Sequence, residues 1–163
     1  MVLAAAEGFS IASTPGKDSD DDRSTFRFFL GLDKKRITAF SNSGKSVALL
    51  DRSIHTLLAH QYAVNKLFNR NTFSDCLADS RTEAMWPDLI VYLDADQSLL
   101  EARARHRHTP VLPLFILPEY NVEFRNYFFN EGKKHQPLLI VDGGMTSERA
   151  AIFIAELVGI KNK

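Results

Sequence analysis

Two continuous apolar runs that each end in an aspartate constrain the fold of this chain most strongly. They are DLIVYLD at 88–94 and PLLIVD at 137–142. A strand with one face in water alternates apolar and polar residues, whereas a strand covered on both faces of a parallel sheet is apolar along its whole length. The two runs therefore predict buried strands of a parallel sheet.

Shorter β-rich runs and helical patterns fill most of the remaining chain. FSIAS at 9–13 and VALL at 47–50 are the other candidate strands. Apolar residues recur at helical spacing in five ranges, which are 26–40, 54–68, 97–108, 118–129 and 146–158. Because strands alternate with helices, we expect right-handed βαβ crossovers and a single α/β domain over 1–163, with a parallel sheet inside three layers. The polar stretch 14–24 and the proline-broken stretch 108–118 are expected to be irregular.

The charge balance and the cysteine count exclude several classes of protein. Twenty basic residues balance twenty acidic ones among 163 residues, so the chain as a whole has no basic field for nucleic acid or anionic membrane, although a local patch stays open. Cys76 is the only cysteine, which excludes a disulfide framework and fits a reducing cytoplasm. No apolar stretch approaches the roughly 18 residues that cross a bilayer, and the start MVLAAAEG does not resemble a signal peptide. We therefore expect a soluble, cytoplasmic protein that binds neither nucleic acid nor membrane.

The tripeptide Gly44-Lys45-Ser46 invites comparison with a phosphate-binding loop. Such a loop has the form GxxxxGK[ST], follows a strand and opens a helix, so that backbone amides at the helix start surround the phosphates. Here Ala39 stands at the place of the first glycine, inside a helical pattern, and the apolar run 47–50 follows Ser46. The order is the reverse of the one required. We interpret Gly44 as the end of the preceding helix.

The same stretch continues into Asp51-Arg52-Ser53, which stands at the end of the candidate strand 47–50. Side chains at the carboxyl edge of a parallel sheet are where α/β proteins bind ligands. Arginine offers a planar fork for phosphate oxygens, and an aspartate can hold that arginine or a hydrated Mg²⁺. A surface ion pair, or an aspartate that caps the next helix, explains the residues equally well. The residues alone leave these alternatives open.

The order of elements resembles the thymidylate kinase-like branch of the P-loop nucleoside and nucleotide kinases. The matching stretches are SIASTPG, FRFFLGLDKKRI, VALLDRSIHTLLAHQ, PDLIVYLDADQSLLEARARHR and LLIVDGGMTSERAAIFIAEL. The resemblance covers nearly the whole chain. It implies a parallel sheet of the P-loop kinase type that lacks its first strand, with a lid-like segment at about 101–118. It also implies ATP-dependent phosphoryl transfer, with Mg²⁺, to a thymidylate-like nucleoside monophosphate.

The resemblance also implies a role for particular residues. It implies catalytic roles for Asp51, Arg52, Arg103, Arg105 and Arg107, with Asp51 also holding the metal. It implies acceptor binding by Thr14, Phe29, Lys34, Ser53 and Gln61, and adenine-side binding by Asp142 and Gly143. Each has a plainer explanation. The arginines fit a solvated basic helix, the phenylalanine a core position, and the glutamine an exposed helix surface.

The chain departs from the family pattern in three ways. The first strand and the GxxxxGK[ST] loop have no counterpart, Thr14 stands where the family has a carboxylate, and Lys34 stands where it has an arginine. A second hypothesis is therefore a non-catalytic nucleotide-binding relative that cannot hold ATP. A third is a generic nucleotide-binding domain, for which VDGGMT at 141–146 is weak support. A sheet without its first strand leaves open edges, so we expect an aggregation-prone chain unless a partner or a second copy, as in a homodimer, covers them.

Overall fold

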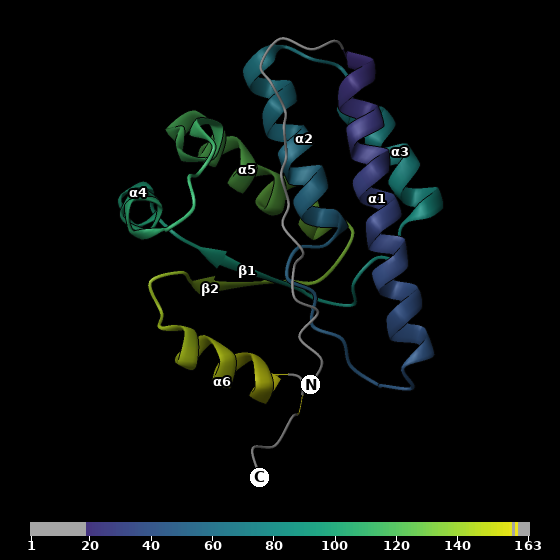
Figure 1. The fold of residues 1–163 in the computed structure, drawn as a ribbon, viewed down its shortest axis with the longest axis vertical. Helices are drawn as coiled ribbons and strands as arrows, with labels where there is room; N and C mark the ends of the chain where they lie inside the picture. The colour runs from purple at the N-terminus through teal and green to yellow at the C-terminus, as the bar shows by residue number, and fades with distance from the viewer. Residues whose placement is uncertain (1–18, 158, 160–163) are drawn as a thin grey trace.

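The computed structural model describes residues 19–157 and Gly159, and this part of the chain is mostly helical (Figure 1). The helices are α1 (Ser19–Asn42), α2 (Ile54–Phe68), α3 (Phe73–Glu83), α4 (Gln97–His106), α5 (Pro118–Asn130) and α6 (Ser147–Leu157), with short 3₁₀ turns η1 (Pro113–Ile116) and η2 (Gly132–Lys134). The strands are β1 (Ile90–Asp94) and β2 (Leu138–Asp142). None of these helices has the length and the apolar character that crossing a bilayer requires.

The two strands form a parallel pair with helices on both sides. The register runs from Ile90 opposite Leu138 to Asp94 opposite Asp142. In Figure 1, α2 and α5 lie on one side of the pair and α6 lies on the other. Tyr92 of β1 stacks on Phe128 of α5 with ring centroids 4.5 Å apart. The predicted strands 88–94 and 137–142 are therefore confirmed as parallel strands, within a residue or two at their ends. The expectation that both are buried is wrong for Leu93 and Ile140, which are 48% and 45% exposed, because only two strands form and their faces are incompletely covered.

The expected three-layer parallel sheet of the P-loop kinase type is wrong for this structure. The described residues are mostly helical, and their sheet has two strands. A strand persists only when its backbone groups pair with a neighbour. Residues 47–50 are irregular, with no bridge to another strand, so this apolar run did not become a strand. The candidate strand 9–13 lies outside the described residues.

Helix boundaries differ from the expected ones where local signals are weak. α1 begins at Ser19, so residues 19–24 are helical and not irregular. α3 was not expected, because its sequence FSDCLADSRTE has little apolar periodicity. The stretch 108–118 contains η1 at Pro113–Ile116. Gly44 has a φ of +65° just after the end of α1, as expected for a glycine that ends a helix.

The core forms where α2 meets its neighbours. Ile54, Leu58 and Ala59 of α2 are fully buried. They pack with residues from the other helices and β1, which are Phe26, Leu30, Cys76, Ile90, Tyr127 and Phe128. At the start of α2 the Ser53 side chain accepts from the backbone N–H of His55, and Asn69 in the left-handed conformation follows its end. The helix is thus defined by its own caps as well as by its apolar face.

Two histidines of α2 are in their uncharged form: His55 is buried in this core, and His60 is half-buried farther along the helix. Nδ1 of His55 lies 2.9 Å from the Tyr127 hydroxyl, and its ring meets Trp86 edge-on at 5.0 Å. Nδ1 of His60 lies 2.9 Å from the Tyr120 hydroxyl. Burial lowers the pKa of each imidazole to about 4, because the charged form loses its hydration there.

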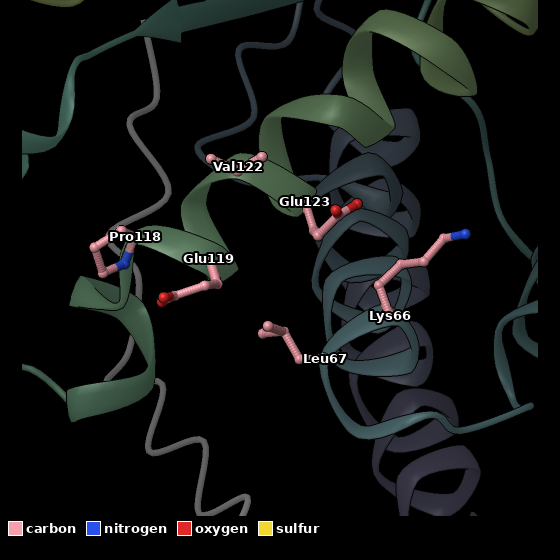
Figure 2. Close-up of a pocket in the computed structure, with 6 residues that line it drawn as sticks. All are labelled: Lys66, Leu67, Pro118, Glu119, Val122 and Glu123. Carbon is pink, nitrogen blue, oxygen red and sulfur yellow. The ribbon is translucent and has the colours of Figure 1, made fainter.

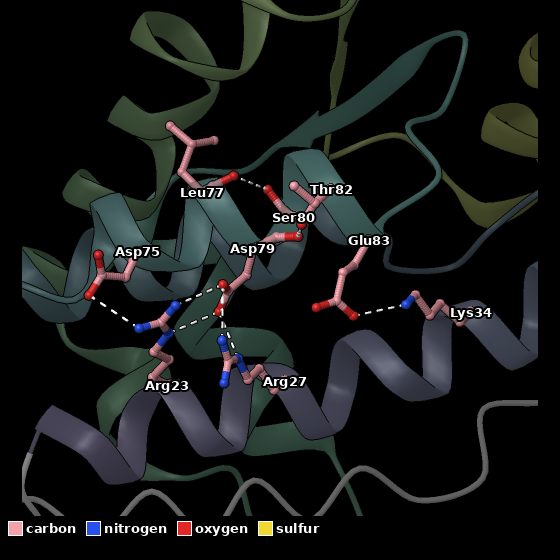
Figure 3. A network of polar contacts seen from close by, with 9 residues as sticks. All are labelled: Arg23, Arg27, Lys34, Asp75, Leu77, Asp79, Ser80, Thr82 and Glu83. Carbon is pink, nitrogen blue, oxygen red and sulfur yellow. Dashed lines mark hydrogen bonds and ion pairs between the residues drawn. The ribbon is translucent and has the colours of Figure 1, made fainter.

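A carboxylate shared by two arginines holds α3 against α1 (Figure 3). Asp79 accepts from Arg23 at 2.9 and 2.8 Å and from Arg27 at 2.8 and 3.2 Å. These hydrogen bonds hold the pKa of Asp79 well below its usual range. Farther along the same helix pair, Lys34 binds Glu83 at 2.8 Å. The weak apolar pattern of α3 is therefore supplemented by ionic contacts.

Truncation of the α2 core should destabilise the chain strongly. We expect Leu58→Ala to lower the free energy of unfolding by about 2–5 kcal/mol, because it removes packed methyl groups and leaves a cavity. Leu112→Ala is the matched control, since Leu112 is 42% exposed. Urea unfolding followed by circular dichroism measures both. Equal effects from the two variants would contradict the assignment of Leu58 to the core.

Stability should fall in mild acid because the fold excludes charged imidazole. Each of these histidines has a pKa of about 4 in the folded chain and of about 6.5 in the unfolded chain. At a pH above about 6.5 both states hold a neutral imidazole, and the chain has its full free energy of unfolding. The contribution of each histidine is lost as the pH falls from about 6.5 toward 4, by up to about 3 kcal/mol for the fully buried His55 and by less for the half-buried His60, which solvent screens in part. Urea unfolding at a series of pH values tests this loss.

The variant that isolates this effect is His55→Gln, with His106→Gln on the exposed end of α4 as the control. The first substitution should reduce the acid dependence between pH 6.5 and 4 and leave the smaller part that is due to His60, and the second should leave it unchanged. Stability that does not vary over this pH interval in the unsubstituted chain would contradict the burial of neutral imidazoles.

Candidate functional site

The carboxyl ends of β1 and β2 gather five residues that we call the strand-end site: Asp94, Arg103, Arg125, Asp142 and Gly143. Asp94 and Asp142 are opposite one another in the register of the parallel strands. The strands leave the sheet at the same edge, and each leads through a short loop into a helix, α4 or α6. Because parallel strands end together, side chains from separate parts of the chain meet here.

Gly143 allows the loop after β2 to lie against the end of β1. Its backbone N–H donates to the Asp94 carbonyl at 2.7 Å. A Cβ atom at this position would lie 2.7 Å from the Asp94 carbonyl oxygen and 2.9 Å from the Ala95 Cβ. No side chain fits so close to backbone atoms. The loop geometry therefore requires glycine at position 143.

Asp142 shapes the turn that leads from β2 into α6. Its Oδ1 accepts from the backbone N–H of Gly144 at 2.8 Å, and its carbonyl accepts from Met145 N–H at 3.2 Å. The hydroxyl of Thr146 accepts from Arg149 N–H at 3.3 Å and so satisfies one donor at the start of α6. The carboxylate of Asp142 is exposed beside this loop.

Arg103 reaches the same loop from α4. Its Nη2 donates to the Gly143 carbonyl oxygen. This contact leaves the positive charge of the guanidinium without a carboxylate partner among the described residues. Arg103 is exposed, so the charge is accessible to a ligand. A guanidinium in this state binds phosphate oxygens well.

The position of α4 is determined by contacts at its start. Asp96 caps the helix by accepting from Leu99 N–H at 2.8 Å. Gln97 donates to the Ile116 carbonyl at 2.8 Å and accepts from the Asn121 amide at 2.8 Å. These contacts connect α4 to η1 and α5. The expected lid-like segment at about 101–118 therefore contains η1, whose Ile116 carbonyl is bonded to Gln97 at the start of α4.

Arg125 of α5 neutralises the second carboxylate of the site. Its Nε and Nη2 donate to the two carboxylate oxygens of Asp94 at 2.8 and 2.6 Å, and its guanidinium lies 4.8 Å from the centre of the Phe129 ring. The hydrogen bonds to Asp94 raise the pKa of Arg125. Asp94 is therefore held by its partner. Arg103 and the exposed carboxylate of Asp142 are the two charges of the site that have no ion-pair partner among the described residues.

The start of α2 holds a second set of predicted residues. Asp51 and Arg52 are exposed, and Arg52 has a left-handed backbone with a φ of 66°. Ser53 is the residue that caps α2. Burial raises the pKa of the Tyr120 hydroxyl, and the positive charge of Arg52 partly offsets this rise. Arg52 is therefore near the first turn of α5, the element that also contacts the start of α4.

Asp33 is a buried carboxylate at the start of α2 that the sequence did not reveal. It accepts from the backbone N–H of Ile54, and burial raises its pKa more than this bond and the Arg36 charge lower it. Arg36 Nη1 lies 3.8 Å from its Oδ1. An anion at a helix N-terminus interacts favourably with the helix dipole. No spacing rule predicts this contact, because α1 and α2 are brought together by tertiary packing alone.

Three of the predicted acceptor residues have structural partners. Phe29 is buried in the core and meets Phe28 edge-on at 5.4 Å. Lys34 is paired with Glu83. Gln61 is buried, not exposed, and its amide donates to the Thr72 hydroxyl. These contacts account for the three side chains without a ligand.

The remaining predicted residues lie apart from the strand-end site or outside the description. Arg105 is exposed and lies 3.9 Å from Glu101 on its own helix, and Arg107 is exposed just after the end of α4. Thr14 lies outside the described residues. Within residues 19–157 no three or more His, Cys, Asp or Glu side chains could share a metal ion. Asp51 would therefore need ligand oxygens from a substrate to hold Mg²⁺.

A hollow of about 310 Å³ lies between the end of α2 and the start of α5 (Figure 2). Its lining residues are Lys66, Leu67, Pro118, Glu119, Val122 and Glu123. Two glutamates and one lysine give it a net negative charge, which disfavours a phosphate. None of the predicted site residues lines this hollow.

Comparison with models of known protein families and with curated protein sequences finds no match for this chain.

Gly143→Ala should destabilise the strand-end site directly. The added methyl group would clash with the Asp94 carbonyl at 2.7 Å, and we expect a loss of about 1–3 kcal/mol of unfolding free energy. Gly144→Ala is the matched control, because its Cβ would meet only the movable Asp142 side chain, at 3.1 Å. Thermal and urea unfolding compare the two. Equal stability of both variants would contradict the close approach at Gly143.

Proposed function

We propose that this chain is a nucleotide kinase-like protein that transfers the γ-phosphoryl group of ATP, with Mg²⁺, to a thymidylate-like nucleoside monophosphate. Phosphoryl transfer depends mainly on positioning and on neutralising charge, so arginines and a metal around the phosphates do most of the catalysis. We place this activity in the cytoplasm, in keeping with a single, buried cysteine.

One observation carries the proposal. Arg103, Asp142 and Gly143 were assigned to a nucleotide site from separate stretches of sequence, and they lie together at the carboxyl end of two parallel strands, where Arg103 contacts Gly143. This edge of a parallel sheet is where phosphates and nucleotides bind in many proteins. The meeting of residues 40 positions apart supports a shared binding role.

The proposed roles follow from charge and exposure. Arg103 binds phosphate oxygens with the part of its guanidinium that does not contact Gly143, and the Asp142–Gly143 loop borders the adenine. Arg52 orients the acceptor phosphate from the start of α2. Asp51 holds Mg²⁺ together with the phosphate oxygens. Arg105 and Arg107 add positive charge at the end of α4.

A second candidate is a nucleotide-binding protein without catalytic activity. The observation that favours it is the structure after Gly44-Lys45-Ser46, where the described chain continues without helix until α2 begins at Ile54. The tripeptide therefore does not open a helix, and it offers no N-terminal amides to a triphosphate. In this case the chain would bind a monophosphate and leave ATP unbound.

Calorimetric titration with thymidine monophosphate and, separately, with ATP and Mg²⁺ tests these proposals. We expect Arg103→Ala to weaken nucleotide binding by about tenfold or more, which is the loss of one charge-assisted contact. Arg81→Ala is the matched control, because Arg81 is an exposed arginine on α3, across the molecule from α4 (Figure 1). It should bind like the unsubstituted chain.

Each outcome decides between the candidates. Binding of both nucleotides, with phosphate transfer detected by chromatography, supports the kinase. Monophosphate binding without ATP binding supports the non-catalytic protein. If neither nucleotide binds to a chain that unfolds cooperatively, both proposals are overturned.

A further inference from the structure

Asp142 and Arg103 carry opposite charges at the strand-end site and do not pair with each other. The guanidinium of Arg103 donates to the carbonyl oxygen of Gly143, which is the next residue after Asp142. Both charged side chains are exposed, yet no ion pair within 4.0 Å joins them. Opposite charges at adjoining positions ordinarily pair, so the contacts that keep these two apart define what the site can bind.

Hydrogen bonds to the backbone of the loop orient each charge. Oδ1 of Asp142 accepts from Gly144 N–H at 2.8 Å, and Nη2 of Arg103 donates to the Gly143 carbonyl oxygen. Each bond uses only part of the side chain. Oδ2 of Asp142, and Nε and Nη1 of Arg103, have no hydrogen-bond partner among the described residues. The loop therefore presents a free carboxylate acceptor beside free guanidinium donors.

The other carboxylates near the strand ends do not share this arrangement. Arg125 donates to both oxygens of Asp94, so that carboxylate is occupied. Asp96 caps the start of α4, about 10 Å along the helix axis from Arg103 at a rise of about 1.5 Å per residue. Asp142 is thus the carboxylate that can share a ligand with Arg103.

We propose that Asp142 binds the ribose hydroxyls of the nucleotide whose phosphates bind Arg103, so that the site selects a ribonucleotide over its dideoxy analogue. This inference rests on the proposed nucleotide binding and deepens it. An ionised carboxylate accepts hydrogen bonds and donates none, and the 2′- and 3′-hydroxyls of ribose are donors. An acidic side chain binds a ribose hydroxyl in the same way in dinucleotide-binding folds.

The small separation between the two charges favours the ribose over the base. Arg103 contacts residue 143 and Asp142 precedes it, so a ligand that reaches both must carry its donor close to a phosphate. In a nucleotide the ribose is joined to the phosphates through its own C5′, whereas the amino group of adenine lies beyond the ribose. The charge of Asp142 repels phosphate, which places this carboxylate beside a neutral donor. The backbone of the loop then borders the adenine.

Calorimetric titration of the full chain, with Mg²⁺, tests the inference with three nucleotides. They are ATP, dideoxy-ATP, which lacks both ribose hydroxyls, and inosine triphosphate, which keeps the ribose and lacks the amino group of adenine. We expect ATP to bind about tenfold or more tightly than dideoxy-ATP, because the analogue loses a hydrogen bond to a charged group. This comparison uses the unsubstituted chain and needs no variant.

Asp142→Asn assigns the preference to this side chain. Its amide oxygen can still accept from Gly144 N–H, so the turn is kept, while the free carboxylate oxygen is lost. We expect the ratio of the dissociation constants for dideoxy-ATP and ATP to fall to about one. The ratio is the readout, because the loss of a negative charge strengthens binding of both triphosphates alike. The ratio of inosine triphosphate to ATP should not change.

The matched control is Asp88→Asn. Asp88 is exposed and precedes β1, at the opposite end of the strands from Asp142. The substitution removes the same charge away from the site, so the preference for ATP over dideoxy-ATP should stay that of the unsubstituted chain. Circular dichroism and urea unfolding establish that both variants are folded before binding is compared.

Equal binding of ATP and dideoxy-ATP by the unsubstituted chain overturns the inference and leaves the proposed nucleotide binding intact. A preference for ATP that Asp142→Asn retains also overturns it, since another group then binds the hydroxyls. A change in the ratio of inosine triphosphate to ATP alone would assign Asp142 to the adenine amino group instead. A chain that binds none of the triphosphates overturns the phosphoryl-transfer proposal and this inference together, a result distinct from equal binding.

Discussion

The packing of α2 against α5 is the constraint on which the rest of this structure depends. Ile54, Leu58 and His55 of α2 are buried beside Tyr127 of α5. α5 in turn covers one face of the strands through the stack of Phe128 on Tyr92. α1 and α3 complete the same core and are joined to each other through Asp79. A loss of the contact between α2 and α5 would therefore expose both the core and the sheet.

The strand-end site is a consequence of this packing and not a separate module. α5 supplies Arg125 to Asp94 and holds the start of α4 through Asn121 and Gln97. α4 then directs Arg103 to the loop at Gly143. The arrangement leaves one arginine charge without a carboxylate partner beside a turn that only glycine can form. Charge of this kind, held by a rigid scaffold, suits recognition of a phosphate.

Sequence reasoning succeeded where a segment carries its own signal. The range 54–68 agrees with α2 at both ends, because its apolar residues recur at helical spacing. The cap is Ser53 and not Asp51, and Asn69 ends the helix in the left-handed conformation. The apolar runs before Asp94 and Asp142 became strands that pair in register. Sequence reasoning failed where the formation of a helix or strand depends on contacts with another segment of the chain. Residues 47–50 have the composition of a strand but found no neighbour, and α3 gains part of its stability from arginines on α1.

The sequence by itself determined the two parallel strands and the positions of most helices, because these follow from local periodicity. Only the tertiary structure decided that the sheet has two strands, that Gln61 is buried, and that Arg103 meets Gly143 while Arg125 holds Asp94. Contacts between distant segments depend on the relative placement of whole helices. That placement is set by the sum of the packing energies, which no single stretch of sequence contains.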